Sequence, residues 1–122
     1  MTLTEYNSFC ESLPHSTHVV QWRGAYVWKV AGKVYAIGRP EDDQLSHCSF
    51  KVSPMSFDIM KAQPGLRGAP NLASRGMNWI QWFSHETLSD EELKSYIAGS
   101  HSLVAAGFSK KKQRELGFLP DA

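Results

Sequence analysis

The stretch AYVWKVAGKVYAIG, residues 25 to 38, decides the fold because it holds two alternating segments joined by a short glycine turn. Apolar and polar side chains alternate along AYVWKV and KVYAIG, as they do along β-strands that bury one face. Ala31-Gly32-Lys33 forms a tight connection between them. The two segments are therefore predicted to pair as an antiparallel hairpin.

The same period of two continues on both sides of this hairpin. THVVQW before it and LSHCSFKV after it are typical of two further strands, which gives four strands in this half of the chain. Alternation puts Lys29 and Lys51 on one side of their strands and apolar residues on the other. The predicted core side of the second and fourth strands consists of Tyr26, Trp28, Val30, Cys48, Phe50 and Val52.

Three segments have the apolar spacing or the end signals of helices. The first is predicted to be capped by Thr4 and to end before Pro14. The second, SPMSFDIMKAQ, begins with a serine cap and has proline at the first helical position. The third follows the capping-box sequence SDEE and is predicted to run to about Ala106.

The segment PGLRGAPNLASRG, residues 64 to 76, is rich in glycine and proline, and we expect a long loop with one helical turn at residues 71 to 74. Loops of this length are uncommon in compact domains and often functional. NWIQWF then predicts a last strand. The order α-β-β-β-β-α-β-α favours an α+β two-layer fold, with an antiparallel sheet of five or so strands and helices packed on one face. We expect a single domain over residues 1–122, with a basic C-terminal tail from about residue 109.

The cellular compartment is predicted from the N-terminal sequence, from the lengths of the apolar segments and from the spacing of the two cysteines. MTLTEYNSF lacks a basic segment followed by an apolar run, and no later segment approaches the ~18 apolar residues of a membrane span. Cys10 and Cys48 lie in patterned segments without CxxC spacing, which is typical of reduced core thiols. We therefore expect a cytoplasmic protein without a membrane partner.

Positive charge is concentrated in two zones, although the net charge of the chain is only +1. A C-terminal zone could contact nucleic acid phosphates, but lysines beyond a helix end also complement the helix dipole. Both interpretations stay open at this point. The first zone contains Lys61, Arg67 and Arg75, and the second contains Lys110, Lys111, Lys112 and Arg114.

Several motifs follow one another along the chain: FCESLP (9–14), YVWKVAGKVYAI (26–37), SFKVSP (49–54), QPGLRGAP (63–70), a strand led by Trp79, and LSDEELKSYIAGSHSLV (88–104) followed by KKKQREL. Their order and spacing resemble the bacterial MmcQ/YjbR family over nearly the whole chain. The resemblance implies a fold like that of frataxin and the secretion chaperones. It also implies a double-wing DNA-binding protein.

The leading hypothesis is a small binding protein that contacts DNA weakly, through its phosphates and largely without sequence preference. No segment offers a recognition helix rich in Arg, Asn and Gln. A basic arm, a basic loop and the outward sheet face are the expected contact regions. The predicted nucleic-acid-binding residues are Lys51, Arg67, Arg75, Trp79, Lys110, Lys111, Lys112 and Arg114.

The alternative hypothesis is a protein-interaction or small-ligand module that uses the open sheet face and residues 65–76 as a groove for a peptide or a metabolite. The sequence contains no GxSxG, no P-loop and no paired carboxylates in apolar surroundings, so we do not expect an enzyme. His15 and His18 form an H-x-x-H in a connection, where histidines are mostly solvated. No cofactor and no metal is expected.

Overall fold

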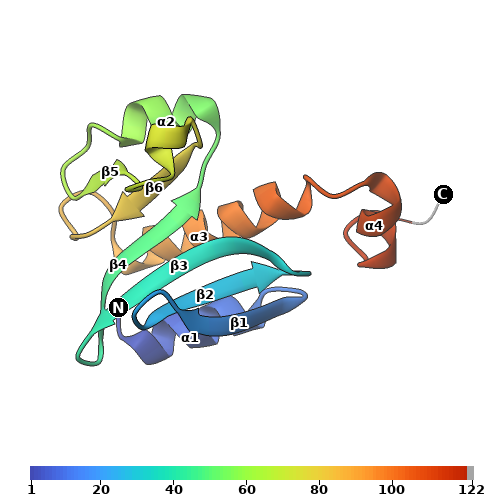
Figure 1. Ribbon diagram of the computed structural model, residues 1–122, viewed down its shortest axis with the longest axis horizontal. Coiled ribbons are helices and arrows are strands. Elements are labelled where there is room, and N and C mark those ends of the chain that lie inside the picture. Colours follow the sequence, from blue (N-terminus) through green and yellow to red (C-terminus); the bar gives the residue numbers. More distant parts are fainter. Residues whose placement is uncertain (121–122) are drawn as a thin grey trace.

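A six-stranded antiparallel sheet is the framework of the computed structural model, which describes residues 1–120 (Figure 1). The strand order is β1-β2-β3-β4-β6-β5. The predicted hairpin is present, because Val30 pairs with Lys33 across the turn formed by Ala31 and Gly32. The strands are β1 (Ser16–Gln21), β2 (Ala25–Val30), β3 (Lys33–Glu41), β4 (Gln44–Lys51), β5 (Leu66–Gly68) and β6 (Trp79–Trp82).

The helices confirm the α+β class, whereas the likeness to frataxin and the secretion chaperones stays a prediction. They are α1 (Leu3–Ser12), α2 (Pro54–Met60), α3 (Asp90–Ala105) and α4 (Lys110–Glu115), with a 3-10 turn η1 (Ala73–Arg75). No described helix has both the length and the apolar character that are needed to cross a bilayer. The sheet has one strand more than the predicted order, because β5 lies in the segment that was predicted to be a loop.

The helices α1 and α3 contact each other and cover one face of the sheet (Figure 1). Tyr6 and Cys10 of α1 and Leu93 of α3 are fully buried there, in one cluster with the apolar sides of the strands. Of the six residues that alternation assigned to the core side of the second and fourth strands, five belong to this cluster and Tyr26, which is partly buried, packs against it. The period of two therefore predicted the buried face correctly.

Caps set the ends of the helices. Ser53 and Pro54 open α2, and both hydrogen bonds of the capping box at Ser89 are present in α3, as predicted. The predicted cap of α1 was wrong by two residues. Thr2, not Thr4, accepts the first-turn hydrogen bond, at 3.0 Å from the Glu5 nitrogen, because the helix already begins at residue 3.

The sheet opens between β3 and β4, where a side chain from α3 enters. The two strands pair as far as Ala36 and Phe50, and Lys51 goes on to pair with Trp79 of β6. Beyond that point the fully buried Ser100 hydroxyl donates to the Tyr35 carbonyl at 2.7 Å and accepts from the Lys51 N–H at 2.8 Å. The hydroxyl thus bridges two strands whose own ladder has ended. Figure 1 shows β1–β3 and β4–β6 diverging there, with α3 behind them.

Candidate functional site: a basic groove on the open sheet face

The face of the sheet opposite α1 and α3 carries one row of side chains across all six strands. Each residue of this row pairs with the next residue of the row on the adjacent strand, and none of them belongs to the core cluster. The row changes from apolar at β1 to polar and basic at β5. From edge to edge it consists of Val19, Val27, Ile37, Ser49, Gln81 and Arg67.

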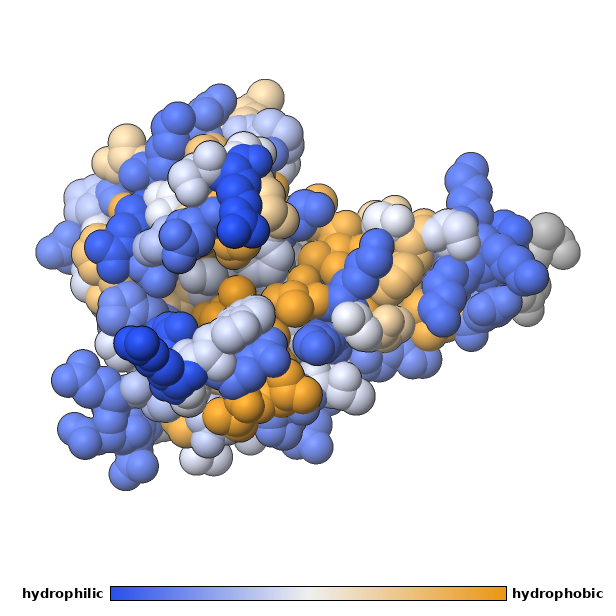
Figure 2. Space-filling model, viewed as in Figure 1, coloured by the Kyte–Doolittle hydropathy of each residue, from blue (hydrophilic) through white to orange (hydrophobic). Residues whose placement is uncertain are grey.

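Two adjoining cavities of about 340 and 500 Å³ lie on this face and share Trp22, Ile37 and Leu72 as lining residues. The turn after β1 forms one wall, and residues 69–77 between β5 and β6 form the other. We call the two cavities together the open-face groove. Figure 2 shows apolar residues along the middle of this face, with hydrophilic residues on either side.

The turn after β1 places an aromatic ring at the edge of the open-face groove. Trp22, Arg23 and Gly24 all have positive φ angles, of 51°, 63° and 90°, so the chain reverses within three residues. Arg39 Nη1 donates to the Trp22 carbonyl at 2.7 Å and ties this turn to β3. The Trp22 side chain remains 52% exposed, whereas Val27 on the same sheet face is fully buried.

One end of the open-face groove is surrounded by arginines. Arg39, Arg75 and Gln81 line the larger cavity. Arg67 Nε donates to Gln81 Oε1 at 2.7 Å, and its guanidinium lies 4.5 Å from the centre of the Phe83 ring. Arg67 therefore borders the same end, although it does not line the cavity.

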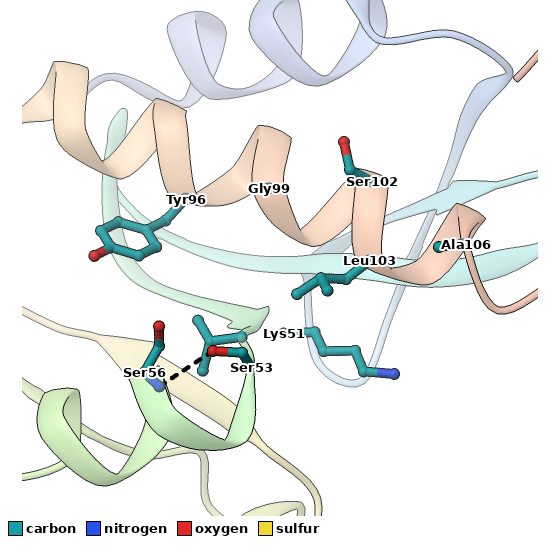
Figure 3. A pocket seen from close by; sticks show the side chains of 9 residues that line it. Lys51, Ser53, Ser56, Tyr96, Gly99, Ser102, Leu103 and Ala106 are labelled. Carbon is teal, nitrogen blue, oxygen red and sulfur yellow. Dashed lines mark hydrogen bonds between the residues drawn. The ribbon is translucent and has the colours of Figure 1, made fainter.

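Lysines stand at the other end of the open-face groove. Lys33 and the half-buried Lys51 line the smaller cavity together with Val104 of α3. Figure 3 shows a neighbouring pocket between α2 and α3, which Lys51 also lines, and in it the Lys51 side chain extends beneath Leu103 toward the C-terminal end of α3. Across residues 1–120, the basic groups that lie within 4.0 Å of a carboxylate oxygen are the Met1 amine, Lys61, Lys94 and the His85 ring. The basic residues of the groove therefore have no carboxylate partner within the described chain.

The predicted basic tail forms the separate helix α4. Ser109 caps it by accepting a hydrogen bond from the Lys112 nitrogen at 3.1 Å. The three lysines occupy its first turn, where positive charge does not complement the dipole of α4. A 2.6 Å hydrogen bond from His15 Nε2 to the Leu116 carbonyl holds α4 against the domain.

The two predicted basic zones do not meet. Figure 1 shows α4 at one end of the molecule's long axis and β5 and β6 toward the other end. The open-face groove includes Arg75 of the first zone at its arginine end. Its lysine end reaches toward α4, because Lys33 Nζ lies 4.9 Å from the centre of the Phe108 ring, in the link between α3 and α4.

The predicted site residues are thus divided among three places. Lys51 and Arg75 line the open-face groove, and Arg67 borders it. Trp79 also lines the groove, but it is only 5% exposed, so its ring offers little free surface to a stacking base. The residues predicted as a basic arm stand apart on α4; these are Lys110, Lys111, Lys112 and Arg114.

The predicted binding residues leave out three residues of the open-face groove, namely Trp22, Lys33 and Arg39, although Trp22 lacks apolar partners along the chain. A signal for Arg39 was present, since alternation along β3 places it on the same side as Ile37. The Arg-Gly pair after Trp22 is a weaker signal of a turn. Nothing in the local pattern indicates that the turn folds over the sheet.

A model of the YjbR family matches residues 11–103 of the chain. The crystal structure of Deinococcus radiodurans protein DR2400, which has a DUF419 domain, is similar with a TM-score of 0.80 and 29% sequence identity, over 99% of this chain and 91% of that one. A Pseudomonas syringae protein shares the fold with a TM-score of 0.64 and 18% identity, over 84% of this chain and 98% of that one. A search of curated proteins found no match.

Proposed function

The chain belongs to the YjbR family, and we propose that it is a binding protein that holds nucleic acid through phosphate contacts in the open-face groove. The positive charge of the groove is the observation that supports this proposal. Lys33, Arg39, Lys51 and Arg75 line the two cavities, and none of the lining residues is acidic. Unpaired cations gathered on one face are the electrostatic footprint of phosphate binding.

The electrostatic attraction for phosphates is confined to the groove, because the net charge of the whole chain is only +1. The acidic run Glu41-Asp42-Asp43 lies at the turn between β3 and β4, and none of its members lines the groove. Arg67 adds a further cation at the arginine end. We therefore expect weak binding with little sequence preference, in which phosphates set the position of the nucleic acid.

The number of cations sets the expected salt dependence. Four phosphate contacts give a slope of log affinity against log salt of about −2.8 for a single strand and about −3.6 for a duplex. Affinity should then fall roughly 50-fold to 150-fold between about 50 and 200 mM salt.

Fluorescence anisotropy of labelled DNA at these two salt concentrations tests the proposal. A variant with Lys33→Gln, Arg39→Gln, Lys51→Gln and Arg75→Gln should lose most of the affinity and most of the salt slope. A matched variant with glutamine at positions 110–112 removes three exposed lysines outside the groove and should retain both. The proposal is wrong if the groove variant binds like the parent protein, or if the α4 variant alone abolishes binding.

A second candidate function is the binding of an anionic small ligand or peptide in the same groove. The lysine end favours it, because Leu72, Met77 and Trp79 give that cavity an apolar lining beside Lys51. Cavities of this size are typical of small-ligand sites. Such a ligand would raise the melting temperature of the parent protein and displace labelled DNA, and the Lys51→Gln variant would respond less.

We also propose that the protein binds without catalysing a reaction. The chemistry of its thiols supports this view. Burial raises the pKa of Cys10 to about 12 and also raises the pKa of Cys48, so both stay protonated at neutral pH and neither supplies a thiolate nucleophile. Both side chains lie in the core, on the face opposite the groove. Hydrolysis of the bound nucleic acid during a prolonged incubation would contradict the proposal.

A further inference from the structure

Resting on the proposed function, we infer that the open-face groove takes a single strand of nucleic acid, with a base stacked on Trp22, rather than a duplex. Trp22 stands out among the four tryptophans, because its side chain is 52% exposed while Trp28, Trp79 and Trp82 are 3 to 5% exposed. An exposed aromatic beside cations is the pattern that proteins use to bind single strands.

The Trp22 ring, which would form the stacking surface, is carried by a short turn and not by a long loop. Its backbone lies in a three-residue turn, and the hydrogen bond from Arg39 fixes its carbonyl. The same Arg39 side chain lines the larger cavity together with Arg75 and Trp22. One cavity thus offers a stacking surface for a base and two cations for the phosphates on either side of its nucleotide.

The shape of the groove also favours a single strand. Its cations line recesses of about 340 and 500 Å³, and Arg39 and Lys51 are half-buried, so a ligand must enter the groove to reach these two, whereas Lys33 and Arg75 are exposed. The stacked base pairs of a duplex cannot leave the helix axis without being flipped. The unpaired bases of a single strand can splay out into such recesses. Asn71 and Gln81 line the larger cavity and can hydrogen-bond to base edges.

A duplex would instead be expected to contact the ridge beside the groove. Arg23 is exposed at the tip of the β1–β2 turn and does not line either cavity. It follows Trp22 directly and shares its positive φ, at 63°. Arg23 is therefore a matched control, since a duplex clamped by the ridges would depend on Arg23 and a strand in the groove would depend on Trp22.

The experiment compares a labelled oligothymidylate of about 12 nucleotides, within the usual range of single-strand site sizes, with a duplex of equal length at about 50 mM salt. The single strand should bind more tightly than the duplex. Trp22→Ala should weaken single-strand binding roughly 5-fold to 150-fold, the range measured when a stacking residue is removed. Arg23→Ala should change the affinity for the single strand by less than about twofold. Trp22→Phe keeps an aromatic ring and should therefore retain most of the affinity that Trp22→Ala loses.

Intrinsic fluorescence gives an independent readout, because Trp22 is the tryptophan whose ring a ligand can reach. Adding the oligothymidylate should quench the parent protein and should not quench Trp22→Ala. The inference is overturned if the duplex binds as tightly as the single strand, or if Trp22→Ala leaves single-strand affinity unchanged. In either case the proposed function survives if the fourfold groove variant still loses DNA binding. If neither form of DNA binds the parent protein, the proposed function fails as well.

Discussion

Replacing Ser100 by alanine should lower the free energy of unfolding by about 2–4 kcal/mol, because one buried hydroxyl carries two hydrogen bonds to the main chain. The hydroxyl donates to the Tyr35 carbonyl at 2.7 Å and accepts from the Lys51 N–H at 2.8 Å. Ser100 is fully buried, so water cannot replace these bonds without entering the core. The alanine variant would leave a donor on β4 and an acceptor on β3 without their present partner.

The magnitude follows from the cost of unpaired polar groups in the interior. A buried donor left unsatisfied costs about 1–3 kcal/mol, and a lost hydrogen bond contributes about 1 kcal/mol more. Partial closure of β3 onto β4 would recover some of this energy, which sets the lower end of the range. Because domains of this size are stable by roughly 5–15 kcal/mol, a loss of 2–4 kcal/mol is readily measured.

Urea unfolding followed by far-ultraviolet circular dichroism is the assay, with Ser102→Ala as the matched control. Ser102 lies two residues further along α3 and is exposed, so its replacement should change stability by less than about 0.5 kcal/mol. The reasoning is refuted if Ser100→Ala is as stable as Ser102→Ala. That result would mean that the two strands are not held apart by this hydroxyl.

Four further predictions concern the packing, the thiols and the caps. Gly38→Ala should lower stability by about 1–3 kcal/mol, because the added Cβ would lie 2.5 Å from ring carbons of the fully buried Tyr6; urea unfolding measures the loss. Thiol reagents at pH 8 should label Cys10 and Cys48 only in denatured protein. The free energy of unfolding should fall as pH rises above about 8.5, because the thiols of the unfolded chain then ionise while Cys10 in the folded protein keeps its proton up to about pH 12. The fall should be at most about 1.4 kcal/mol per pH unit for each thiol. Urea unfolding from pH 8 to 10 measures it. Ser89→Ala removes the cap of α3 and should cost about 1 kcal/mol, measured in the same way.

Each of these predictions has an outcome that contradicts it. A fully stable Gly38→Ala would mean that the Tyr6 ring can move aside without loss. Rapid labelling of either cysteine in native protein would mean that the core opens readily around it. A Ser89→Ala variant as stable as the parent would place the stability of the α3 N-terminus in side-chain packing rather than in the capping box.

Much of the fold could be predicted because local patterns determine it. The period of two identified β1–β4 and β6 and the core side of β2 and β4, and the capping sequence located the start of α3. The strand β5 was missed because three residues are too few to show alternation, and its pairing with β6 depends on tertiary packing. The helix α4 was expected as a tail because a six-residue segment rich in lysine has little helical signal of its own.

Less of the candidate site could be predicted, since the site depends on how distant segments meet. The side of the strand on which Lys51 lies followed from alternation, and Arg75 followed from its position in a long segment rich in glycine. That Trp22 is exposed while Trp79 is buried could not be predicted. The difference depends on the fold of residues 69–77 and on the turn at residue 22, and neither has a periodic signal.

Because side chains alternate between the two faces of a pleated sheet, residues of the open-face groove can be exchanged during evolution separately from the residues of the core. Arg39 and Lys51 alternate along their strands with core residues, and Arg75 lies in a connection, so none of the three packs into the core cluster. Exchanging them alters the charge offered to a ligand and leaves the core cluster intact, although an exchange at Arg39 also removes its hydrogen bond to the Trp22 carbonyl. The charge of this face can therefore change in the present chain without a compensating change in its core.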